Sequence, residues 1–194
     1  KYYLYVPAKD KQDIFKIGVA VSDRPEGPFT AEPEPIAGTF SMDPSAFQDG
    51  AEYYLLWGGI WGGQLQWYED QKLVEGRKGP TDGIPAPDKK ALMPYIAKLA
   101  DSMTELAEKP REILILDESG EPIKAGDTNR RFFEAAWMHK YNGKYYLSYS
   151  TGDTHFIAYA IGDTPYGPFT YKGNVLDPVE GWTNHHSIVE FEGK

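Results

Sequence analysis

The amino-acid sequence predicts an all-β fold built from repeated hairpin units in a radial array. Three observations predict it: a segment that recurs along the chain, a two-residue turn at Asn142-Gly143, and abundant aromatic residues, with 14 Tyr, 9 Phe and 5 Trp. Asn-Gly favours the positive φ angles of a tight hairpin, and aromatic side chains favour strands. Units that cannot bury their faces alone stack into a propeller or another radial all-β array.

The recurring segment joins two strands to a Gly-Pro turn. KYYLY at 1–5 and IGVAVSDRPEGPFT at 17–30 return as KYYLSY at 144–149 and IAYAIGDTPYGPFT at 157–170. The first half occurs a third time, as EYYLLW at 52–57. Each unit therefore predicts a strand, a hairpin turn, a second strand, a turn marked by Pro and Gly-Pro, and a short outer strand.

The repeats divide the chain into four units, each expected to be one blade. These are a first blade that lacks its opening strand (1–38), a second (39–124), a third (125–177) and the start of a fourth (178–194). About three blades are thus expected within the 194 residues. Because Lys1 falls in the expected middle of a strand, we expect the chain to be an excerpt of a longer protein.

The second unit is expected to carry an insertion at about residues 60–112. It contains a Gly- and Trp-rich loop, a charged connector and a segment with apolar residues at alternating spacings of four and three. Those residues are Leu92, Ile96, Leu99, Met103 and Leu106. The spacing predicts an amphipathic helix that ends at Pro110 and packs against the repeats.

The charge balance restricts the classes of partner. With 20 basic and 29 acidic residues, the formal net charge is -9, and no basic stripe interrupts the acidic surplus. This argues against nucleic acid or an anionic membrane as a partner and favours a neutral ligand. The chain has no cysteine, which excludes a disulfide framework and cysteine-based catalysis.

Glu134 is the residue with the most unusual surroundings. It lies in the apolar run FFEAAW at 132–137, just before the Asn142-Gly143 hairpin. One interpretation is a carboxylate that faces solvent from an edge strand. The other is burial, which raises the pKa of a carboxyl group, as a general acid near neutral pH requires.

Opening strands of successive propeller blades line a shared tunnel. Asp43, Glu134 and the pair His185-His186 are then expected at equivalent positions around one axis. Two carboxyl groups around one small pocket can cleave a glycosidic bond, because one protonates the leaving oxygen while another activates water.

Five features together resemble glycoside hydrolase family 43. They are Met42-Asp43-Pro44, Phe133-Glu134-Ala135, the hairpin Asn142-Gly143-Lys144-Tyr145-Tyr146, the Gly-Pro-Phe turns and His185-His186-Ser187-Ile188-Val189. The resemblance covers the chain outside the insertion. It implies a five-bladed β-propeller and an enzyme that hydrolyses xylose- or arabinose-containing, plant cell-wall-type oligosaccharides, as a β-xylosidase or α-L-arabinofuranosidase.

The resemblance also implies roles for single residues. Glu134 is similar in position to the general acid of the family, and Asp43 to the carboxylate that raises the pKa of that acid and orients the substrate. The family implies inversion, with an aspartate as general base on the opening strand of the first blade. That aspartate is expected upstream of Lys1 and therefore outside this chain.

The histidine pair is a candidate ion site. His185 matches the tunnel histidine of the family, and His186 is its neighbour, so the resemblance implies a calcium or other ion, or a water, in the central tunnel, with no organic cofactor. A histidine pair also occurs as a packing or hydrogen-bonding feature.

Four further side chains are candidate substrate contacts. Trp57, Trp61 and Trp137 could stack on a pentose, or they could pack within and between blades. His155, near an expected hairpin tip, could reach the edge of the pocket.

Two other functions remain open at this stage. A propeller phosphorylase acting on mannosides would need a basic phosphate site, for which Arg130 and Arg131 are the only candidates near Glu134. A non-catalytic carbohydrate-binding propeller would lack the upstream aspartate. A polysaccharide substrate favours an extracellular or periplasmic location, and a cytoplasmic one stays open.

Overall fold

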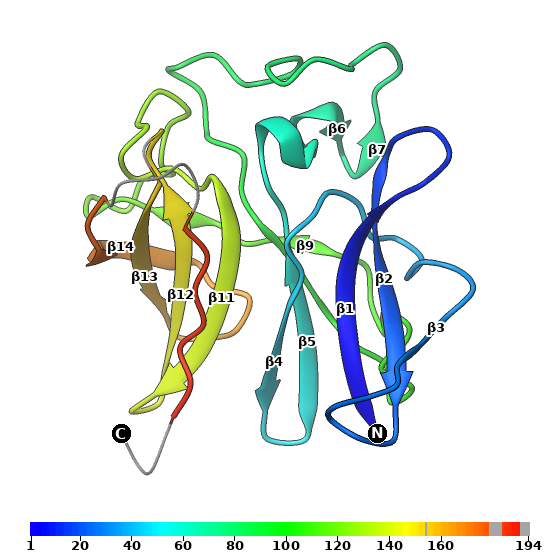
Figure 1. Ribbon diagram of the computed structural model, residues 1–194. Coiled ribbons are helices and arrows are strands. Elements are labelled where there is room, and N and C mark those ends of the chain that lie inside the picture. The colour runs from blue at the N-terminus through cyan, green and yellow to red at the C-terminus, as the bar shows by residue number, and fades with distance from the viewer. Residues whose placement is uncertain (154, 179–183, 191–194) are drawn as a thin grey trace.

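A computed structural model describes residues 1–153, 155–178 and 184–190. Apart from two short 3-10 helices, the regular elements in these ranges are strands, and they form three main sheets side by side (Figure 1). The prediction of an all-β fold is confirmed. No helix in the described ranges is long and apolar enough to cross a bilayer.

The first sheet has three antiparallel strands, in spatial order β1-β2-β3. They are β1 (Tyr2–Lys9), β2 (Phe15–Ser22) and β3 (Thr30–Ala31). The middle strand buries Ile17 and Val19, as its apolar composition requires, whereas β1 leaves alternate apolar side chains exposed. β1 is therefore the open edge of this sheet within the described structure.

The second sheet has four antiparallel strands, in the order β4-β5-β8-β9. They are β4 (Ser45–Asp49), β5 (Glu52–Trp57), β8 (Tyr95–Lys98) and β9 (Arg111–Glu112). The connection from β5 to β8 carries the two 3-10 helices and a small hairpin. Their bounds are Trp61–Gly63, Leu65–Trp67, β6 (Tyr68–Glu69) and β7 (Lys72–Leu73). In Figure 1 this connection lies above the sheets.

The third sheet has the order β11-β12-β13-β14-β10. The antiparallel strands are β11 (Glu134–Tyr141), β12 (Lys144–Thr151), β13 (Phe156–Gly162) and β14 (Phe169–Leu176). β10 (Ile115–Leu116) adds a short parallel strand at the outer edge. Asn142 and Gly143 have φ angles of 48° and 75°, which confirms the predicted two-residue turn.

The strand orders bring the opening strands together. In the repeat alignment, β1, β5 and β12 are equivalent second strands, so β4 and β11 are the opening strands of their sheets. These two strands contact each other, and the Ser45 hydroxyl in β4 donates a 2.6 Å hydrogen bond to the carbonyl of Ala136 in β11. Further out, the rings of Phe47 and Tyr145 meet edge to face. The predicted convergence of opening strands is therefore present for this pair.

The predicted amphipathic helix was wrong. The described chain from residue 92 to 106 contains strand β8 and a turn, in which Leu99 and Leu106 form an antiparallel bridge. The neighbours Ile96 and Ala97 are both fully buried, so burial here does not follow one helical face. The helical spacing has a different cause. Strand β8 is buried on both faces, and the turn after it brings Leu106 back beside Leu99 in the same core.

The same region shows that the expected insertion contains strands of the second sheet. β8 and β9 fall between residues 60 and 112, yet β8 pairs directly with β5. The blade boundaries drawn from the sequence stay predictions.

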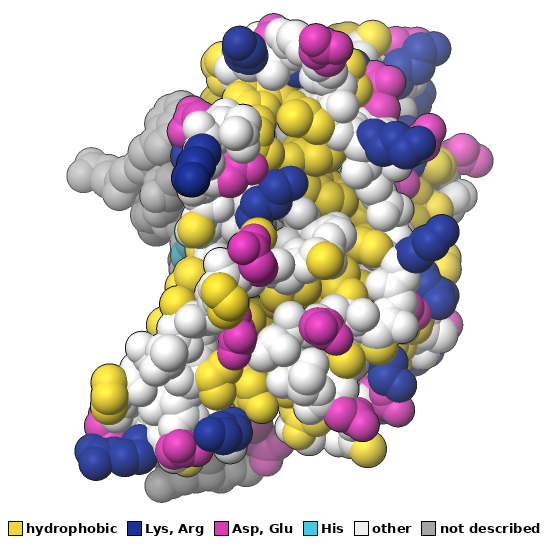
Figure 2. Space-filling model, turned by 90° about the vertical axis from the view of Figure 1, so that its right-hand side faces the viewer, with side chains coloured by type: hydrophobic (Ala, Val, Ile, Leu, Met, Phe, Trp, Pro, Cys, Tyr) yellow, Lys and Arg dark blue, Asp and Glu magenta, His cyan; other side chains and the backbone are white. Residues whose placement is uncertain are grey.

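Charges of both signs are spread over the face on the side of the first sheet. Viewed from there, hydrophobic side chains are surrounded by Lys and Arg interspersed with Asp and Glu (Figure 2). This face carries no continuous basic stripe, in keeping with the acidic total of the sequence.

Candidate active site

Asp43 lies directly before β4, in a backbone conformation that aims its carboxyl group at β11. Its φ angle is 56°, in the left-handed region. The carboxylate accepts a 3.2 Å hydrogen bond from the backbone N–H of Ala135, 92 residues away in the sequence. The two opening strands are thus joined at the point where each carries its acidic residue.

Glu134 begins β11 and is 5% exposed. The pairing of β11 with β12 shifts register between Glu134 and Trp137, and Ala135 has a φ angle of 57°. This β-bulge turns the chain sharply after Glu134, as bulges beside functional sites commonly do.

The loop after β5 covers Glu134. The backbone N–H of Ile60 donates to the carbonyl of Phe133, and a Cβ added to Gly59 would lie 3.4 Å from the Cβ of Glu134. The added atom would also lie 3.0 Å from the Met42 side chain, so glycine leaves room for this loop beside Met42 and Glu134. The sequence run at 132–137 predicts a carboxyl in apolar surroundings, and the structure has it buried rather than exposed on an edge.

His185 joins the two carboxyl groups from the segment after β14. Its Nε2 atom lies 3.5 Å from an Asp43 carboxylate oxygen and 4.0 Å from one of Glu134. One ligand atom of each residue lies within 4.8 Å of the other two. His186 turns elsewhere, because its Nε2 atom shares a 2.6 Å hydrogen bond with the hydroxyl of Ser148.

His155 is not at the pocket edge, as the sequence suggested, but buried beside Glu134. Its side chain is 1% exposed, and its Nε2 atom lies 3.7 Å from a carboxylate oxygen of Glu134. The ring also meets Phe133 edge to face, with centroids 4.5 Å apart. The turn position was readable from the sequence, but the contact with Glu134 depends on the pairing of β12 with both β11 and β13.

The three predicted stacking tryptophans occupy different environments. Trp57 is fully buried among Phe40 and Tyr95, so its prediction as a sugar contact was wrong. Trp61 is half-buried against Phe133. Trp137 is also half-buried, and its indole N–H donates to the carbonyl of Ile188.

A pocket of about 310 Å³ opens beside the acidic pair. It is lined by Tyr5 and Pro7 of β1, by Asp43, Pro44 and Ser45, by Ala135, Ala136 and Trp137, and by His185 and His186. Tyr5, Pro7 and Ser45 were not predicted from the sequence. Tyr5 and Pro7 could have been found from the alternation of side chains along β1, which places them on one face of the strand. Alternation does not indicate which neighbouring sheet that face meets.

Burial dominates the electrostatics of the site. Desolvation raises the pKa of Glu134 to about 7, and the negative charge of Asp43 adds to that rise. Desolvation also raises the pKa of Asp43, while His185 and the Ala135 N–H oppose the rise. The charge of Asp43 thus favours the protonated form of Glu134, while His185 and the Ala135 N–H favour the ionised form of Asp43.

The neighbouring histidine does not cancel this effect. Desolvation lowers the pKa of His155, so its imidazole is neutral near pH 7 and adds no positive charge beside Glu134. Beside the pocket, a carboxyl group with a pKa raised to about 7 therefore lies next to a second carboxyl group, which is an arrangement suited to acid catalysis.

Two carboxyl groups that meet between opening strands are what the resemblance implied, and the chain belongs to a known family. The sequence pattern of "Glycosyl hydrolases family 43" matches residues 1–192. The resemblance noted from single motifs is thus confirmed over nearly the whole chain.

Several named proteins are similar to this chain. A "Xylosidase/arabinosidase" of Bacteroides ovatus is 57% identical and "Xylosidase/arabinosidase 43A" of Humicola insolens is 60% identical, each over all of this chain. A crystal structure of CoXyl43, a "GH43 beta-xylosidase/alpha-arabinofuranosidase from a compost microbial metagenome", superimposes with a TM-score of 0.95 at 61% identity over the full chain. That structure is described as a complex with xylotriose in a calcium-free form.

The chain spans only part of these proteins. It covers 58% of the Bacteroides ovatus protein, 60% of the Humicola insolens protein and 58% of the CoXyl43 chain.

Proposed function

We propose that the full-length protein is a glycoside hydrolase that releases pentoses from xylose- or arabinose-containing oligosaccharides. It is a β-xylosidase or α-L-arabinofuranosidase. The observation that carries this proposal is the meeting of Glu134 and Asp43 where β4 and β11 join, beside a pocket that Asp43 lines. The names of the relatives support the substrate class, and a neutral sugar agrees with the acidic charge of the chain.

Glu134 is the general acid in this proposal. A pKa of about 7 keeps a large share of the carboxyl group protonated at neutral pH, so that it can donate a proton to the leaving glycosidic oxygen. Asp43 assists by raising that pKa through its charge. Held by the Ala135 N–H, its carboxylate also orients the sugar ring.

The second half of the reaction needs a base. We expect an aspartate upstream of Lys1 to activate the attacking water and invert the anomeric carbon. In inverting enzymes, acid and base lie about 6.5–9.5 Å apart to admit that water. Trp61 and Trp137 remain the candidate stacking residues, because both are half-buried. Trp137 lines the pocket, and Trp61 lies in the loop that covers Glu134.

A tunnel ion is a separate part of the proposal. His185 is the exposed imidazole that could face such an ion, whereas His186 is engaged by Ser148. Calcium takes about six to eight oxygen ligands, and one nitrogen with two carboxyl groups is a poor match for that shell. The described side chains alone do not fit calcium, and no step of the reaction is assigned to it.

Phosphorolysis is the less favoured alternative. Arg130 is paired with Asp127 and Glu118, and Arg131 with Asp153, so both candidate phosphate ligands already have acidic partners. A propeller of five blades and an extracellular or periplasmic location remain expectations that accompany the proposed activity.

The direct test is pentose release by the full-length protein from p-nitrophenyl β-xyloside and α-L-arabinofuranoside. We expect Glu134→Gln to lower kcat for xylobiose by about 10²–10⁴-fold, since a general acid contributes that much. The control is Glu69→Gln, which changes an exposed glutamate in β6. Full activity of the Glu134→Gln variant would rule out this acid.

A further inference from the structure

Ser41 lies two residues before Asp43 and is fully buried. Its φ angle is 65° and that of Asp43 is 56°, so both residues adopt the left-handed backbone conformation. Residues other than glycine rarely adopt it, and they persist there where the surrounding structure imposes that geometry. The hydrogen bond from Ala135 fixes the Asp43 side chain, and the geometry at Ser41 has a separate cause.

The Ser41 hydroxyl holds both sides of the 58–63 loop, which follows β5 and covers Glu134. It accepts a 3.0 Å hydrogen bond from the backbone N–H of Gly59 and donates one of 2.6 Å to the carbonyl of Gly63. Removing a buried hydroxyl that serves as both donor and acceptor is costly, because two buried backbone groups lose this partner. A single side chain therefore fastens the loop at both ends.

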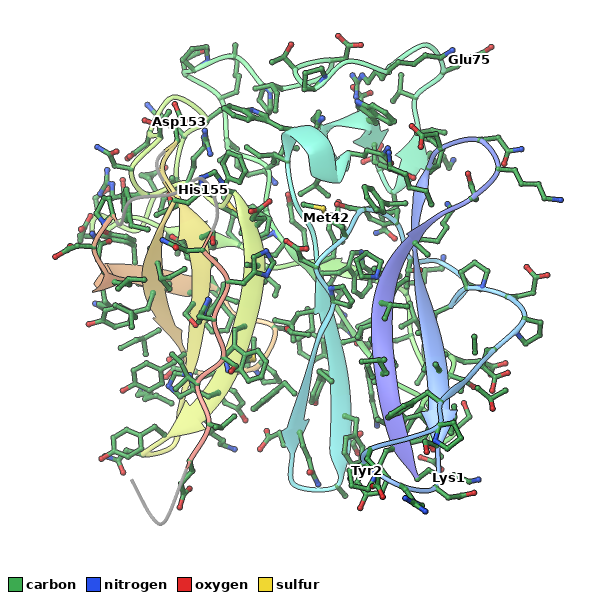
Figure 3. The ribbon with its side chains drawn as sticks, viewed as in Figure 1. Lys1, Tyr2, Met42, Glu75, Asp153 and His155 are labelled. Atoms are coloured by element: carbon green, nitrogen blue, oxygen red, sulfur yellow. The ribbon has the colours of Figure 1, made fainter. Side chains whose placement is uncertain are left out.

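Met42 lies inside the fastened loop. A Cβ atom added to Gly59 or to Gly63 would lie 3.0 Å from the Met42 side chain. Figure 3 shows Met42 directly beneath the coiled ribbon of the two 3-10 helices. The backbone N–H of Gly58 also donates a 2.8 Å hydrogen bond to the carbonyl of Met42. The loop is therefore packed on the residue that precedes Asp43.

The same loop contacts the chain at Glu134. The backbone N–H of Ile60 donates a 2.9 Å hydrogen bond to the carbonyl of Phe133, and a Cβ atom on Gly59 would lie 3.4 Å from the Cβ of Glu134. Gly59 thus binds the Ser41 hydroxyl through its N–H and lies against Glu134 through its α-carbon. The segment 41–43 therefore carries Asp43 and also holds the loop that packs on Glu134.

Gln64 gives the loop a second anchor. It is 3% exposed, its amide oxygen accepts a 2.9 Å hydrogen bond from the N–H of Phe15, and its amide nitrogen donates one of 2.8 Å to the carbonyl of Asp13. These bonds tie the end of the loop to the hairpin between β1 and β2. Because this anchor stays when the Ser41 hydroxyl is removed, we expect the loop to loosen rather than to detach.

We propose that Ser41 is a positioning residue for Glu134. Its hydroxyl holds Gly59 against Glu134 and so fixes the carboxyl group relative to Asp43 and to the leaving oxygen. The proposal rests on the proposed function, in which Glu134 protonates that oxygen. Placement matters for this step, because a shift of about 1 Å in a reacting group can cost about a hundredfold in rate.

The first experiment compares two leaving groups on the full-length protein. Phenol needs a proton as it leaves a β-xyloside, whereas 2,4-dinitrophenolate departs without one. We expect Ser41→Ala to lower kcat/KM for phenyl β-xyloside about tenfold relative to the 2,4-dinitrophenyl compound. A smaller folded fraction would lower both values equally and leave their ratio unchanged. If the wild type prefers arabinofuranosides, the matching α-L-arabinofuranosides are used.

Thr39→Val is the matched control. Thr39 is 3% exposed, and its hydroxyl accepts a 3.2 Å hydrogen bond from the N–H of Ile17 and donates one of 2.7 Å to the carbonyl of Ile36. This variant also loses one accepted and one donated hydrogen bond, but neither involves the 58–63 loop. We expect its substrate ratio to equal that of the wild type. An unchanged ratio in Ser41→Ala, or an equal fall in Thr39→Val, would overturn the proposal.

Ser41→Gly separates the hydroxyl from the backbone. Glycine adopts a φ angle of 65° readily, so this variant removes the hydroxyl without backbone strain and is the one to use if Ser41→Ala does not fold. We expect the same fall in the substrate ratio. A wild-type ratio in Ser41→Gly would refute a role for the hydroxyl.

The proposed function can fail separately. If the wild-type protein released no pentose from any glycoside, carbodiimide labelling of Glu134, read by peptide mass spectrometry, would decide whether Ser41 holds the loop over it. Labelling that rises in Ser41→Ala and stays at the wild-type value in Thr39→Val supports this role. Equal labelling in all three proteins refutes it.

Discussion

Glu134 shows how an environment can set the chemistry of one side chain. Its carboxyl group is covered by the 58–63 loop and by His155, and it faces Asp43 across the junction of two sheets. Both desolvation and the neighbouring charge favour the protonated form. The same two causes lead to separate predictions for activity and for stability.

Asp43→Asn is expected to shift the pH profile of the full-length enzyme. Removing the negative charge lowers the pKa of Glu134, so the acid loses its proton at lower pH. The basic limb of kcat/KM then moves down by about one pH unit. Pentose release measured from pH 5 to 9 checks this, and a basic limb that stays in place would show that desolvation alone sets the pKa.

Glu134→Gln is expected to stabilise the folded protein above neutral pH. The folded pKa of about 7 is raised above the ordinary value of 4.5, so the folded state holds a proton that the unfolded chain has lost. Stability therefore falls as pH rises from about 4.5 to 7, and above pH 7 the buried carboxylate costs about 3 kcal/mol.

The measurement for that prediction is the free energy of unfolding of both proteins at pH 5 and pH 8. The gain from Glu134→Gln should be present at pH 8 and small at pH 5. A gain of the same size at both values would mean that the substitution acts through packing rather than charge.

At the scale of elements, the bulge in β11 determines where the acid points. Ala135 has a φ angle of 57° and its N–H binds Asp43, while the next carbonyl, that of Ala136, accepts the Ser45 hydroxyl. One irregular turn thus connects β4 to β11 on both sides of the acidic pair. A regular strand would place Glu134 by simple alternation and lose these contacts.

Ala135→Val is expected to disturb that bulge. A β-branched side chain is strained at positive φ, so we expect kcat to fall at least tenfold and the protein to lose about 1–3 kcal/mol of stability. Ala135→Gly is the control, because glycine adopts this conformation readily. Equal behaviour of the two variants in kcat and thermal melting would contradict a requirement for this backbone geometry.

At the scale of the whole molecule, the three sheets leave an open edge. β1 is at the end of the first sheet, and Tyr2, Leu4 and Val6 are exposed along it. The unpaired backbone N–H and C=O groups of such an edge, together with its apolar side chains, favour association with other chains.

We expect the 194-residue chain expressed alone to aggregate and to lack a cooperative melt. Leu4→Lys, at an exposed position of that edge, should reduce aggregation of this chain, yet lower the Tm of the full-length protein if β1 is covered there. Light scattering and calorimetry measure the two effects. A sharp melt of the unmodified 194-residue chain would contradict the prediction.

The sequence by itself determined the repeat, the hairpin at Asn142-Gly143, the all-β class and the carboxyl groups of Asp43 and Glu134, because turn chemistry and apolar patterning are local properties. The tertiary structure decided what depends on distant partners. It buried Trp57, replaced the expected helix near Ile96 by a strand, and placed His155 against Glu134. The spacing of apolar residues does not distinguish the apolar face of a helix from a strand and hairpin that pack against one core. It also does not indicate which sheet a side chain will contact. Both outcomes depend on packing between segments that are far apart in the chain.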